Sequence, residues 1–239
     1  MYRKDRKEEF YTTLAKKEGY PARSVYKLKE IDEKYKIIKK GKRVLDLGSA
    51  PGSWLLYISQ KVGDKGKVIG VDIEETKIPQ KANIVFIKRN AFDLERSEVD
   101  EAKASSPPSP AAADLVFKDK GEEDKSSSSP VAQLRLARVF DAVVSDLSPK
   151  TSGVKFLDSG KSLEMAEKSF EIAKSVLLPG GNFICKIFEN ESSDEFLKKV
   201  KKYFDFAKRF KPRAVIKKSR EFYIIGKGFR NPKNSQNSP

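Results

Sequence analysis

Short, mostly apolar runs recur along the chain and are separated by polar or glycine-containing segments. Such runs are typical of strands buried on both faces of a sheet, because neither face then needs polar side chains. Two segments near the C-terminus have a similar but less regular pattern. The apolar runs predict strands at residues 43–48, 67–73, 83–88, 140–147 and 182–188. The two C-terminal segments predict further strands near 207–211 and 221–227.

Stretches with helical spacing separate several of these strands. Residues 53–62 repeat apolar side chains at intervals that place them on one face of a helix. The same spacing predicts helices over 162–177 and about 193–203, and the Leu-Pro-Gly-Gly turn at 178–181 is expected to end the first of these. Strands that alternate with helices indicate an α/β protein with a doubly wound, mainly parallel sheet.

Low-complexity sequence interrupts this alternation. Residues 97–135 contain SSPPSPAAA and GEEDKSSSSP, and such sequence cannot bury enough apolar surface to offset the entropy lost on ordering. We therefore expect a disordered surface insertion there, with 131–140 returning to the fold as a helix or a strand. A disordered tail is expected at 231–239. We expect one domain over 1–230, which contains this insertion and a basic helical extension at 1–40.

The net charge of the chain indicates which kinds of molecule it binds. It carries 49 Lys and Arg against 34 Asp and Glu, a formal net charge of +15. The excess lies at the two ends, with 13 basic and 7 acidic residues in 1–40 and 14 basic and 2 acidic residues in 198–239. This balance predicts attraction to a polyanion, either nucleic acid or an anionic membrane surface. The alternative is a lysine-rich protein whose charges serve solubility alone.

Residue types that are rare or missing exclude several kinds of site. The chain has no histidine, which removes the commonest general base and metal ligand, and no metal site is expected. Its single cysteine, Cys185, allows no disulfide within the chain and fits a reducing compartment. We find no apolar run long enough for a membrane span and no signal peptide in MYRKDRKEEF, so we expect a cytoplasmic protein.

A turn with two glycines follows the first predicted strand, in DLGSAPGSW (46–54). Ligands of doubly wound sheets bind at the carboxyl ends of the strands, and glycine lets a ligand approach the backbone closely. Gly48 and Gly52 do not have the GxGxxG spacing of a dinucleotide site. The carboxylate of Asp46 would repel a pyrophosphate, and it suits a ligand that carries positive charge.

S-adenosylmethionine (SAM) carries such charge on its ammonium and sulfonium groups. Asp72, at the end of the strand 67–73, adds an acid that can accept hydrogen bonds from both ribose hydroxyls. The alternative is that Gly48 and Gly52 serve only the turn and that Asp72 is a solvated strand end. Two acids and two glycines at adjacent strand ends favour a SAM site.

Five blocks of sequence carry a family resemblance that runs in order over nearly the whole chain. They are PARSVYKLKEID (21–32), LDLGSAPGSW (45–54), VVSDLSPKTSG (143–153), LLPGGNFICKIFE (177–189) and SREFYIIGKGF (219–229). Together they resemble the FtsJ/RrmJ-like RNA 2′-O-ribose methyltransferases. The resemblance implies a Rossmann-like class I SAM-dependent methyltransferase fold, with a seven-stranded, mainly parallel sheet and helices on both faces.

The resemblance also implies the residues of the site. A catalytic set of two lysines and two acids falls on Lys27, Asp146, Lys186 and Glu221. The SAM-binding positions are Gly48, Gly52, Trp54 and Asp72, to which Asp46 and Asp146 are added from their places at strand ends. The acid that usually contacts the adenine is replaced here by Asn90, with Asp93 three residues later, so both residues are candidates for that contact.

Methyl transfer to a ribose hydroxyl requires a group that removes or orients the hydroxyl proton. Without histidine, the base must be Lys, Asp, Glu or Tyr, and a lysine serves when burial or a nearby cation lowers its pKa. Lys186 interrupts the apolar strand 182–188, so we expect it to be the base or the group that orients the hydroxyl. Asp146 would orient Lys186, with Lys27 and Glu221 completing the set. A lysine in a structural ion pair is the alternative.

RNA is the partner implied by both charge and resemblance. Basic residues near the N-terminus alternate with aromatic ones that offer stacking faces, and further basic clusters follow strand and helix ends. The alternative is that these basic residues lie on solvated helix and strand faces and do not contact RNA. The residues are Arg3, Lys4, Arg6, Lys7, Lys16, Lys17 and Arg23, with Tyr2, Phe10, Tyr11 and Tyr20, and the clusters are 198–202, 208–213 and 217–220.

The expected substrate is a uridine of large-subunit ribosomal RNA, methylated by a monomer. Two alternatives stay open: a methyltransferase acting on the tRNA anticodon loop, and a non-catalytic RNA-binding factor of ribosome assembly on the same fold. A complete set of two lysines and two acids argues against the non-catalytic reading.

Overall fold

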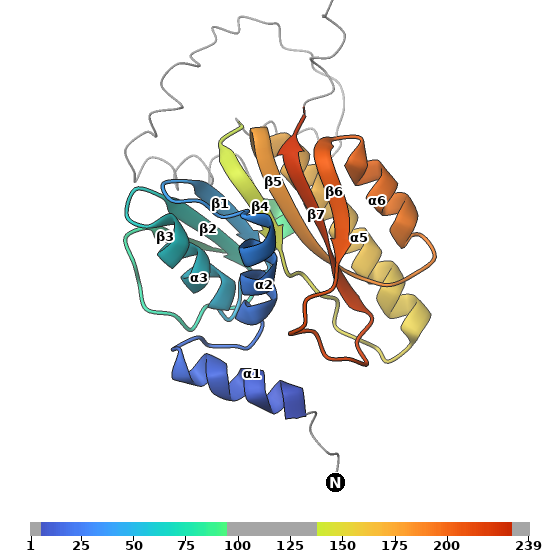
Figure 1. The fold of residues 1–239 in the computed structure, drawn as a ribbon, viewed down its shortest axis with the longest axis horizontal. Helices are drawn as coiled ribbons and strands as arrows, with labels where there is room; N and C mark the ends of the chain where they lie inside the picture. The colour runs from blue at the N-terminus through green and yellow to red at the C-terminus, as the bar shows by residue number, and fades with distance from the viewer. Residues whose placement is uncertain (1–5, 95–137, 231–239) are drawn as a thin grey trace, which may run out of the picture.

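Seven strands form one sheet in the computed structural model, which describes residues 6–94 and 138–230. The expected insertion at 97–135 and tail at 231–239 lie outside the described residues. The strands are β1 (Arg43–Leu47), β2 (Lys67–Asp72), β3 (Ile84–Lys88), β4 (Phe140–Ser145), β5 (Leu177–Phe188), β6 (Phe204–Phe210) and β7 (Glu221–Phe229). Their order in the sheet is β3-β2-β1-β4-β5-β7-β6 (Figure 1).

The strand directions bring several strand ends to one edge. Strands β1 to β5 pair in parallel, whereas β7 is antiparallel to both β5 and β6. In the β5–β7 pair Phe188 lies opposite Glu221, so β7 begins where β5 ends. The predicted seven-stranded, mainly parallel sheet is therefore confirmed, and its ligand edge collects the ends of β1 to β5 and the start of β7.

Helices cover both faces of the sheet, as the fold class predicts. Figure 1 shows α2 and α3 in front of the sheet and α5 behind it, and the buried residues divide accordingly into two hydrophobic clusters. Residues of α5 and α6 belong to one cluster, and residues of α1, α2 and α3 belong to the other. The bounds are α1 (Arg6–Lys17), α2 (Val25–Tyr35), α3 (Ser53–Val62), the short 3-10 helix η1 (Ala91–Asp93), α5 (Lys155–Val176) and α6 (Ser193–Lys201).

Strand β5 contributes to both clusters because its side chains alternate between the faces. Phe183, Cys185 and Ile187 belong to the cluster that contains α5, whereas Ile184 belongs to the cluster that contains α2 and α3. All four side chains are fully buried. Lys186 follows the same alternation and shares the face of Ile184, where α2 packs.

The N-terminal helices differ in how far they are buried. In α2, Val25, Leu28 and Ile31 are completely buried, so this helix is part of the core. In α1 only Ala15 is buried, and Figure 1 shows this helix at the lower end of the molecule, below the sheet. The segment expected to form a helical extension at 1–40 thus holds one core helix and one helix at the rim.

Two predicted boundaries are wrong. Helix α5 begins at Lys155, seven residues before the expected start at 162, and it continues through Gly160. The carboxylate of Asp158 accepts hydrogen bonds from the backbone N–H groups of Ser152 and Gly153 and so stabilises the turn before the helix. The expected turn at 178–181 lies within β5, as an irregularity between the pairs Phe140 to Leu177 and Ala142 to Asn182. The positive φ of Gly180, 78°, is consistent with that local change of direction.

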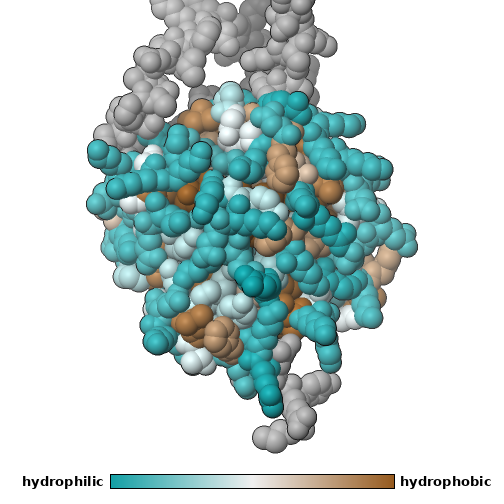
Figure 2. Space-filling model, viewed as in Figure 1, coloured by the Kyte–Doolittle hydropathy of each residue, from teal (hydrophilic) through white to brown (hydrophobic). Residues whose placement is uncertain are grey.

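The surface is largely hydrophilic. Figure 2 shows polar side chains over most of the face seen in Figure 1, with small, separate hydrophobic areas. Among residues 6–94 and 138–230, no helix has the length and apolar character needed to cross a membrane.

Candidate functional site

Two glycines with positive φ shape the turn between β1 and α3. Gly48 and Gly52 have φ values of 77° and 109°, which L side chains rarely adopt. A Cβ at Gly48 would lie 2.9 Å from Leu147 Cδ2, and a Cβ at Gly52 would lie 2.6 Å from Ile78 Cγ2. Leu147 and Ile78 therefore pack closely on the turn, at the ligand edge of the sheet.

Asp46, one of the last residues of β1, is a buried acid without a partner. Its side chain is fully buried, and neither carboxylate oxygen has a hydrogen bond among the described residues. Burial, followed by the nearby charges of Asp146 and Asp72, raises the pKa of Asp46 well above its ordinary value. A buried carboxylate left unpaired is costly, so a cationic ligand group at this position would satisfy it.

Asp72 ties the glycine turn to the end of β2. Its Oδ2 accepts a hydrogen bond of 2.9 Å from the backbone N–H of Ala50, and its Oδ1 accepts one of 2.9 Å from Glu74. The side chain remains partly exposed at the strand end. Each carboxylate oxygen keeps a further lone pair, so the acid can still accept hydrogen bonds from a ligand.

The two candidates for the adenine contact lie next to each other after β3. Asn90 is exposed and caps η1, because its Oδ1 accepts a hydrogen bond of 3.2 Å from the N–H of Phe92. Asp93 is exposed within η1. The backbone N–H of Arg89 donates to the carbonyl of Asp72 at 2.9 Å, which places this segment beside the end of β2.

The four residues of the predicted catalytic set form two ion pairs, each from two different parts of the chain. Lys27 of α2 places its Nζ 2.6 Å from Oε1 of Glu221, the first residue of β7. Lys186 of β5 places its Nζ 3.2 Å from Oδ1 of Asp146, which follows β4, and donates a hydrogen bond of 2.5 Å to the carbonyl of Asp146. All four side chains are largely buried.

Tyr223, which the sequence analysis missed, joins the two ion pairs. Its hydroxyl lies 2.7 Å from Oδ1 of Asp146 and 3.0 Å from Oε1 of Glu221, and the single hydroxyl proton can be donated to one of them at a time. Burial, followed by the charges of the two acids, raises the pKa of Tyr223 well above its ordinary value. The available signal was its spacing, since residues two apart on a strand share a face.

Asp146 stays ionised in this cluster. Burial raises its pKa, but the charges of Lys186 and Lys27 and hydrogen bonds from Tyr223 and Lys186 outweigh burial, so its pKa lies below the ordinary value. It therefore differs from the unpaired Asp46. Within the part of the chain that the structure describes, no group of three or more acidic or cysteine side chains is arranged to hold a metal ion.

Trp54 contacts the ring of Tyr223 and links α3 to the start of α2. Its buried indole donates a hydrogen bond of 3.0 Å to the carbonyl of Ser24, and its ring lies 6.0 Å from that of Tyr223. The hydroxyl oxygen of Ser53 accepts a hydrogen bond of 2.7 Å from the N–H of Ala22. These contacts hold the start of α2 against α3 and so position Lys27, one turn further along.

Part of the expected basic surface gathers near the site. Figure 1 shows α1 and the loop 211–220 at the same end of the molecule, where the loop leads into β7. The cluster 198–202 lies elsewhere, on α6, where Lys199 pairs with acids of α5. Arg3, Lys4 and Tyr2 lie outside the described residues.

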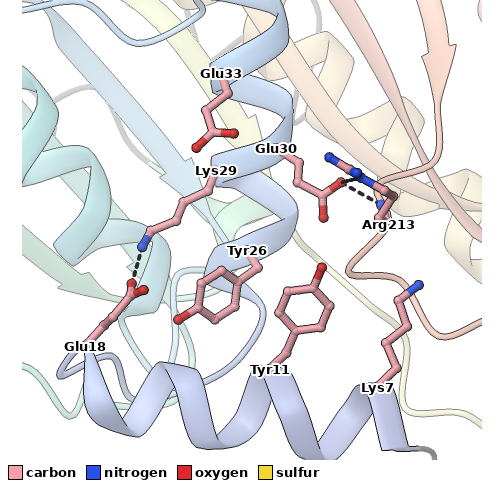
Figure 3. Close-up of a pocket in the computed structure, with 8 residues that line it drawn as sticks. All are labelled: Lys7, Tyr11, Glu18, Tyr26, Lys29, Glu30, Glu33 and Arg213. Carbon is pink, nitrogen blue, oxygen red and sulfur yellow. Dashed lines mark hydrogen bonds and ion pairs between the residues drawn. The ribbon is translucent and has the colours of Figure 1, made fainter.

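A pocket of about 470 Å³ lies between α1, α2 and the loop 211–220 (Figure 3). The carboxylate of Glu30 accepts hydrogen bonds from the backbone N–H groups of Arg213 and Ala214, both at 2.7 Å, and so anchors the loop to α2. Lys27 does not line this pocket, so the pocket is separate from the catalytic set. Its lining consists of Lys7, Tyr11, Glu18, Tyr26, Lys29, Glu30, Glu33 and Arg213.

Known proteins with a similar sequence or fold were found by comparison. A family model described as FtsJ-like methyltransferase matches residues 20–229. Two proteins called ribosomal RNA large subunit methyltransferase E are similar: that of Desulfatibacillum aliphaticivorans is 42% identical over 91% of this chain and 89% of its own, and that of Oleidesulfovibrio alaskensis is 35% identical over 93% and 92%. A crystal structure described as a candidate ribosomal RNA methyltransferase of Plasmodium falciparum matches with a TM-score of 0.64 and 25% identity, over 88% of this chain and 98% of that one.

Proposed function

Because the chain belongs to the FtsJ-like methyltransferase family, we propose that it transfers a methyl group from SAM to the 2′-hydroxyl of a uridine ribose in large-subunit ribosomal RNA. The observation that carries the proposal is the buried cluster in which Tyr223 joins the Lys27–Glu221 and Lys186–Asp146 pairs, next to the unpaired Asp46.

The residues at the ends of β1 and β2 fit SAM. Among the described residues Asp46 has no hydrogen-bond partner, and the charges of Asp146 and Asp72 act on it, so it suits the ammonium group of the methionine part. Gly48 and Gly52 let Leu147 and Ile78 pack directly on the turn, and we propose that the turn shaped in this way receives the ligand. Asp72 would accept hydrogen bonds from the ribose, and Asn90 or Asp93 would contact the adenine. When bound, SAM supplies an electrophilic methyl group on its sulfonium.

Lys186 is the residue that we assign to the 2′-hydroxyl. As a neutral amine it would take the hydroxyl proton, and as an ammonium it would hold the oxygen in a reactive orientation. Either role produces or keeps a cation beside Asp146, whose carboxylate lies 3.2 Å away and stabilises it. Asp146 thereby also fixes the direction of the amine, since its carbonyl accepts a second hydrogen bond from Lys186.

The Lys27–Glu221 pair and Tyr223 hold the centre in place. Glu221 neutralises Lys27 at 2.6 Å, so the cluster contains two cations and two anions. Tyr223 donates to either acid and so holds the two pairs together. A set of this kind is preorganised, because little rearrangement is needed as charge moves from the hydroxyl to Lys186.

Large-subunit ribosomal RNA is the proposed substrate because the curated relatives carry that substrate in their names and match over about nine tenths of this chain. The basic loop 211–220 and α1 lie at the lower end of the molecule and would contact phosphates. The proposed catalytic set is complete within a single chain, and we propose that a monomer acts, in the cytoplasm.

Labelled SAM tests the substrate. The protein would be incubated separately with unmodified large-subunit ribosomal RNA, with assembled large subunits and with total tRNA. We expect label in the ribosomal RNA, either free or assembled, at one ribose. Label in tRNA alone would overturn the proposed substrate, and absence of label in every RNA at saturating SAM would overturn the proposed activity.

A further inference from the structure

Exposed hydrophobic side chains are concentrated in one short segment. Val154 and Leu157 are 52% and 51% exposed, and Phe156 is 85% exposed. Three of the six large hydrophobic residues exposed in the described ranges thus lie within four consecutive positions. Single exposed hydrophobic residues are common, whereas a contiguous group marks an interaction surface. We call residues 154–157 the platform.

The backbone that carries the platform is held from several sides. The carboxylate of Asp158 accepts hydrogen bonds from the N–H and hydroxyl of Ser152, at 2.8 and 2.9 Å, and from the N–H of Gly153 at 3.2 Å. The hydroxyl of Ser159 donates to the carbonyl of Lys155 at 2.8 Å. A ligand that contacts the platform therefore orders little additional backbone, which lowers the cost of binding.

Hydrogen bonds connect the platform to the catalytic cluster. The Arg220 guanidinium donates to the hydroxyl of Ser159 at 2.8 Å and to the carbonyl of Lys155 at 3.2 Å. Arg220 directly precedes Glu221, and its own carbonyl accepts from the N–H of Glu189 at 2.9 Å, beyond the end of β5. Figure 1 shows the start of α5 at the lower end of the molecule, near the loop 211–220. The platform thus lies at the rim of the site.

The charge around the platform is positive. Lys150, Lys155 and Lys161 are exposed along the same segment, and Lys217 and Lys218 are exposed on the neighbouring loop. The acid of the segment, Asp158, is buried and directs its carboxylate into the hydrogen bonds given above. An exposed aromatic ring on a segment that carries exposed lysines fits unpaired nucleotides, whose bases stack on rings and whose phosphates attract cations.

We propose that the platform receives unpaired bases of the RNA substrate next to the target nucleotide, an inference that rests on the proposed function. A nucleotide that leaves the stack to bring its ribose to the buried Lys186 deprives its neighbours of stacking partners, and unpaired bases stack on aromatic side chains. Phe156 would supply a stacking face to one neighbour, with Val154 and Leu157 packing beside it.

The first test compares two exposed phenylalanines in the full chain. Phe156→Ala removes the platform ring, and Phe206→Ala removes a ring that is 42% exposed on β6, opposite Lys227 at the far end of β7 from Glu221. With unmodified large-subunit ribosomal RNA, we expect Phe156→Ala to weaken binding about tenfold or more, the usual loss for one stacked base, and Phe206→Ala to change it less than about twofold. Affinity for SAM and the melting temperature should match the wild type in both variants.

A fluorescence measurement detects the contact directly. The chain has one tryptophan, the buried Trp54, so Phe156→Trp adds an exposed reporter, and the wild-type signal can be subtracted. We expect RNA to quench the added emission, because a base stacks on the indole. The same RNA affinity for Phe156→Ala as for the wild type, or an unquenched reporter under saturating RNA, would overturn the inference.

The two proposals fail in different ways. If the wild type methylates ribosomal RNA and Phe156→Ala binds that RNA equally well, the platform inference is wrong and the proposed function stands. If RNA quenches the reporter but no RNA is methylated, the function is wrong and the contact stands. A change in the sedimentation of the chain with Phe156→Ala, without a change in RNA affinity, would assign the platform to self-association and overturn the inference.

Discussion

The Tyr223 hydroxyl lies 2.7 Å from Oδ1 of Asp146, and this contact joins two ion pairs that would otherwise be separate. Asp146 belongs to the pair with Lys186, and Glu221, 3.0 Å from the same hydroxyl, belongs to the pair with Lys27. The position of Lys186 therefore depends on a tyrosine as well as on its direct partner.

Removal of that hydroxyl should slow methyl transfer. For Tyr223→Phe we expect kcat to fall about tenfold or more, because a hydrogen bond to a charged group contributes about 1.5–3 kcal/mol. SAM affinity should change only slightly. Tyr57→Phe is the control, since Tyr57 donates a buried hydrogen bond of 2.9 Å to Asp32 outside the cluster. Equal kcat losses in the two variants would show that the effect is structural.

Asp46 predicts a dependence of stability on pH. Its pKa is raised in the folded protein, so the ligand-free fold loses stability as pH rises from the ordinary pKa of an aspartate through the raised value. Asp46→Asn removes this titration. The melting temperature of the variant should therefore exceed that of the wild type increasingly as pH rises, while its affinity for SAM falls. A constant difference between pH 5 and 9 would contradict this account of Asp46.

Two glycines with nearly equal φ allow the effect of backbone strain on SAM binding to be distinguished from the effect of a steric clash. Gly48 and Gly41 have φ values of 77° and 75°, but a Cβ would meet Leu147 at 2.9 Å from Gly48 and nothing within 4 Å from Gly41. We expect Gly48→Ala to reduce both the melting temperature and SAM affinity, whereas Gly41→Ala reduces only the melting temperature. Calorimetry and equilibrium SAM binding measure both. Equal SAM affinities in the two variants would place the ligand away from this turn.

RNA affinity should depend on salt through the loop 211–220. Lys217 and Lys218 are exposed on this loop, near the site. Their joint replacement by alanine should reduce the slope of log Kd against log salt by about 1.4, if each contacts one phosphate of a single strand. The matched control replaces Lys198 of α6 and Lys202, which directly follows that helix; both are also exposed, and the slope should stay unchanged. Equal slopes in the wild type and both variants would show that the loop does not contact RNA phosphates.

The sheet was predictable because its strands are apolar runs with clear ends. Local pattern also places Asp46 and Asp72 at strand ends, where parallel pairing brings them to one edge. The start of α5 was not predictable in this way, because Asp158 stabilises a turn through contacts that local spacing does not reveal. The turn expected at 178–181 lies inside β5, because pairing with β4 continues on both sides of it.

The site was predictable through the family resemblance more than through the residues themselves. Lys27 and Glu221 lie 194 positions apart along the chain, and only the fold brings their charges to 2.6 Å. Tyr223 was missed because a tyrosine in an apolar strand looks like an ordinary core residue. Its role follows from the antiparallel pairing of β7 with β5, which sets Tyr223 opposite Lys186.

The most direct test of the central claim is methylation of unmodified large-subunit ribosomal RNA with labelled SAM, followed by mapping of the modified atom. The wild type should place the methyl group on a ribose 2′-oxygen. Lys186→Ala should lose about a hundredfold or more of this activity while binding SAM within a few-fold of the wild type. The control is Lys67→Ala. It removes another buried lysine, at the start of β2 and away from the ligand edge, and the variant should stay active. Methylation of a base atom, or more than about a tenth of wild-type activity in Lys186→Ala, would contradict the account.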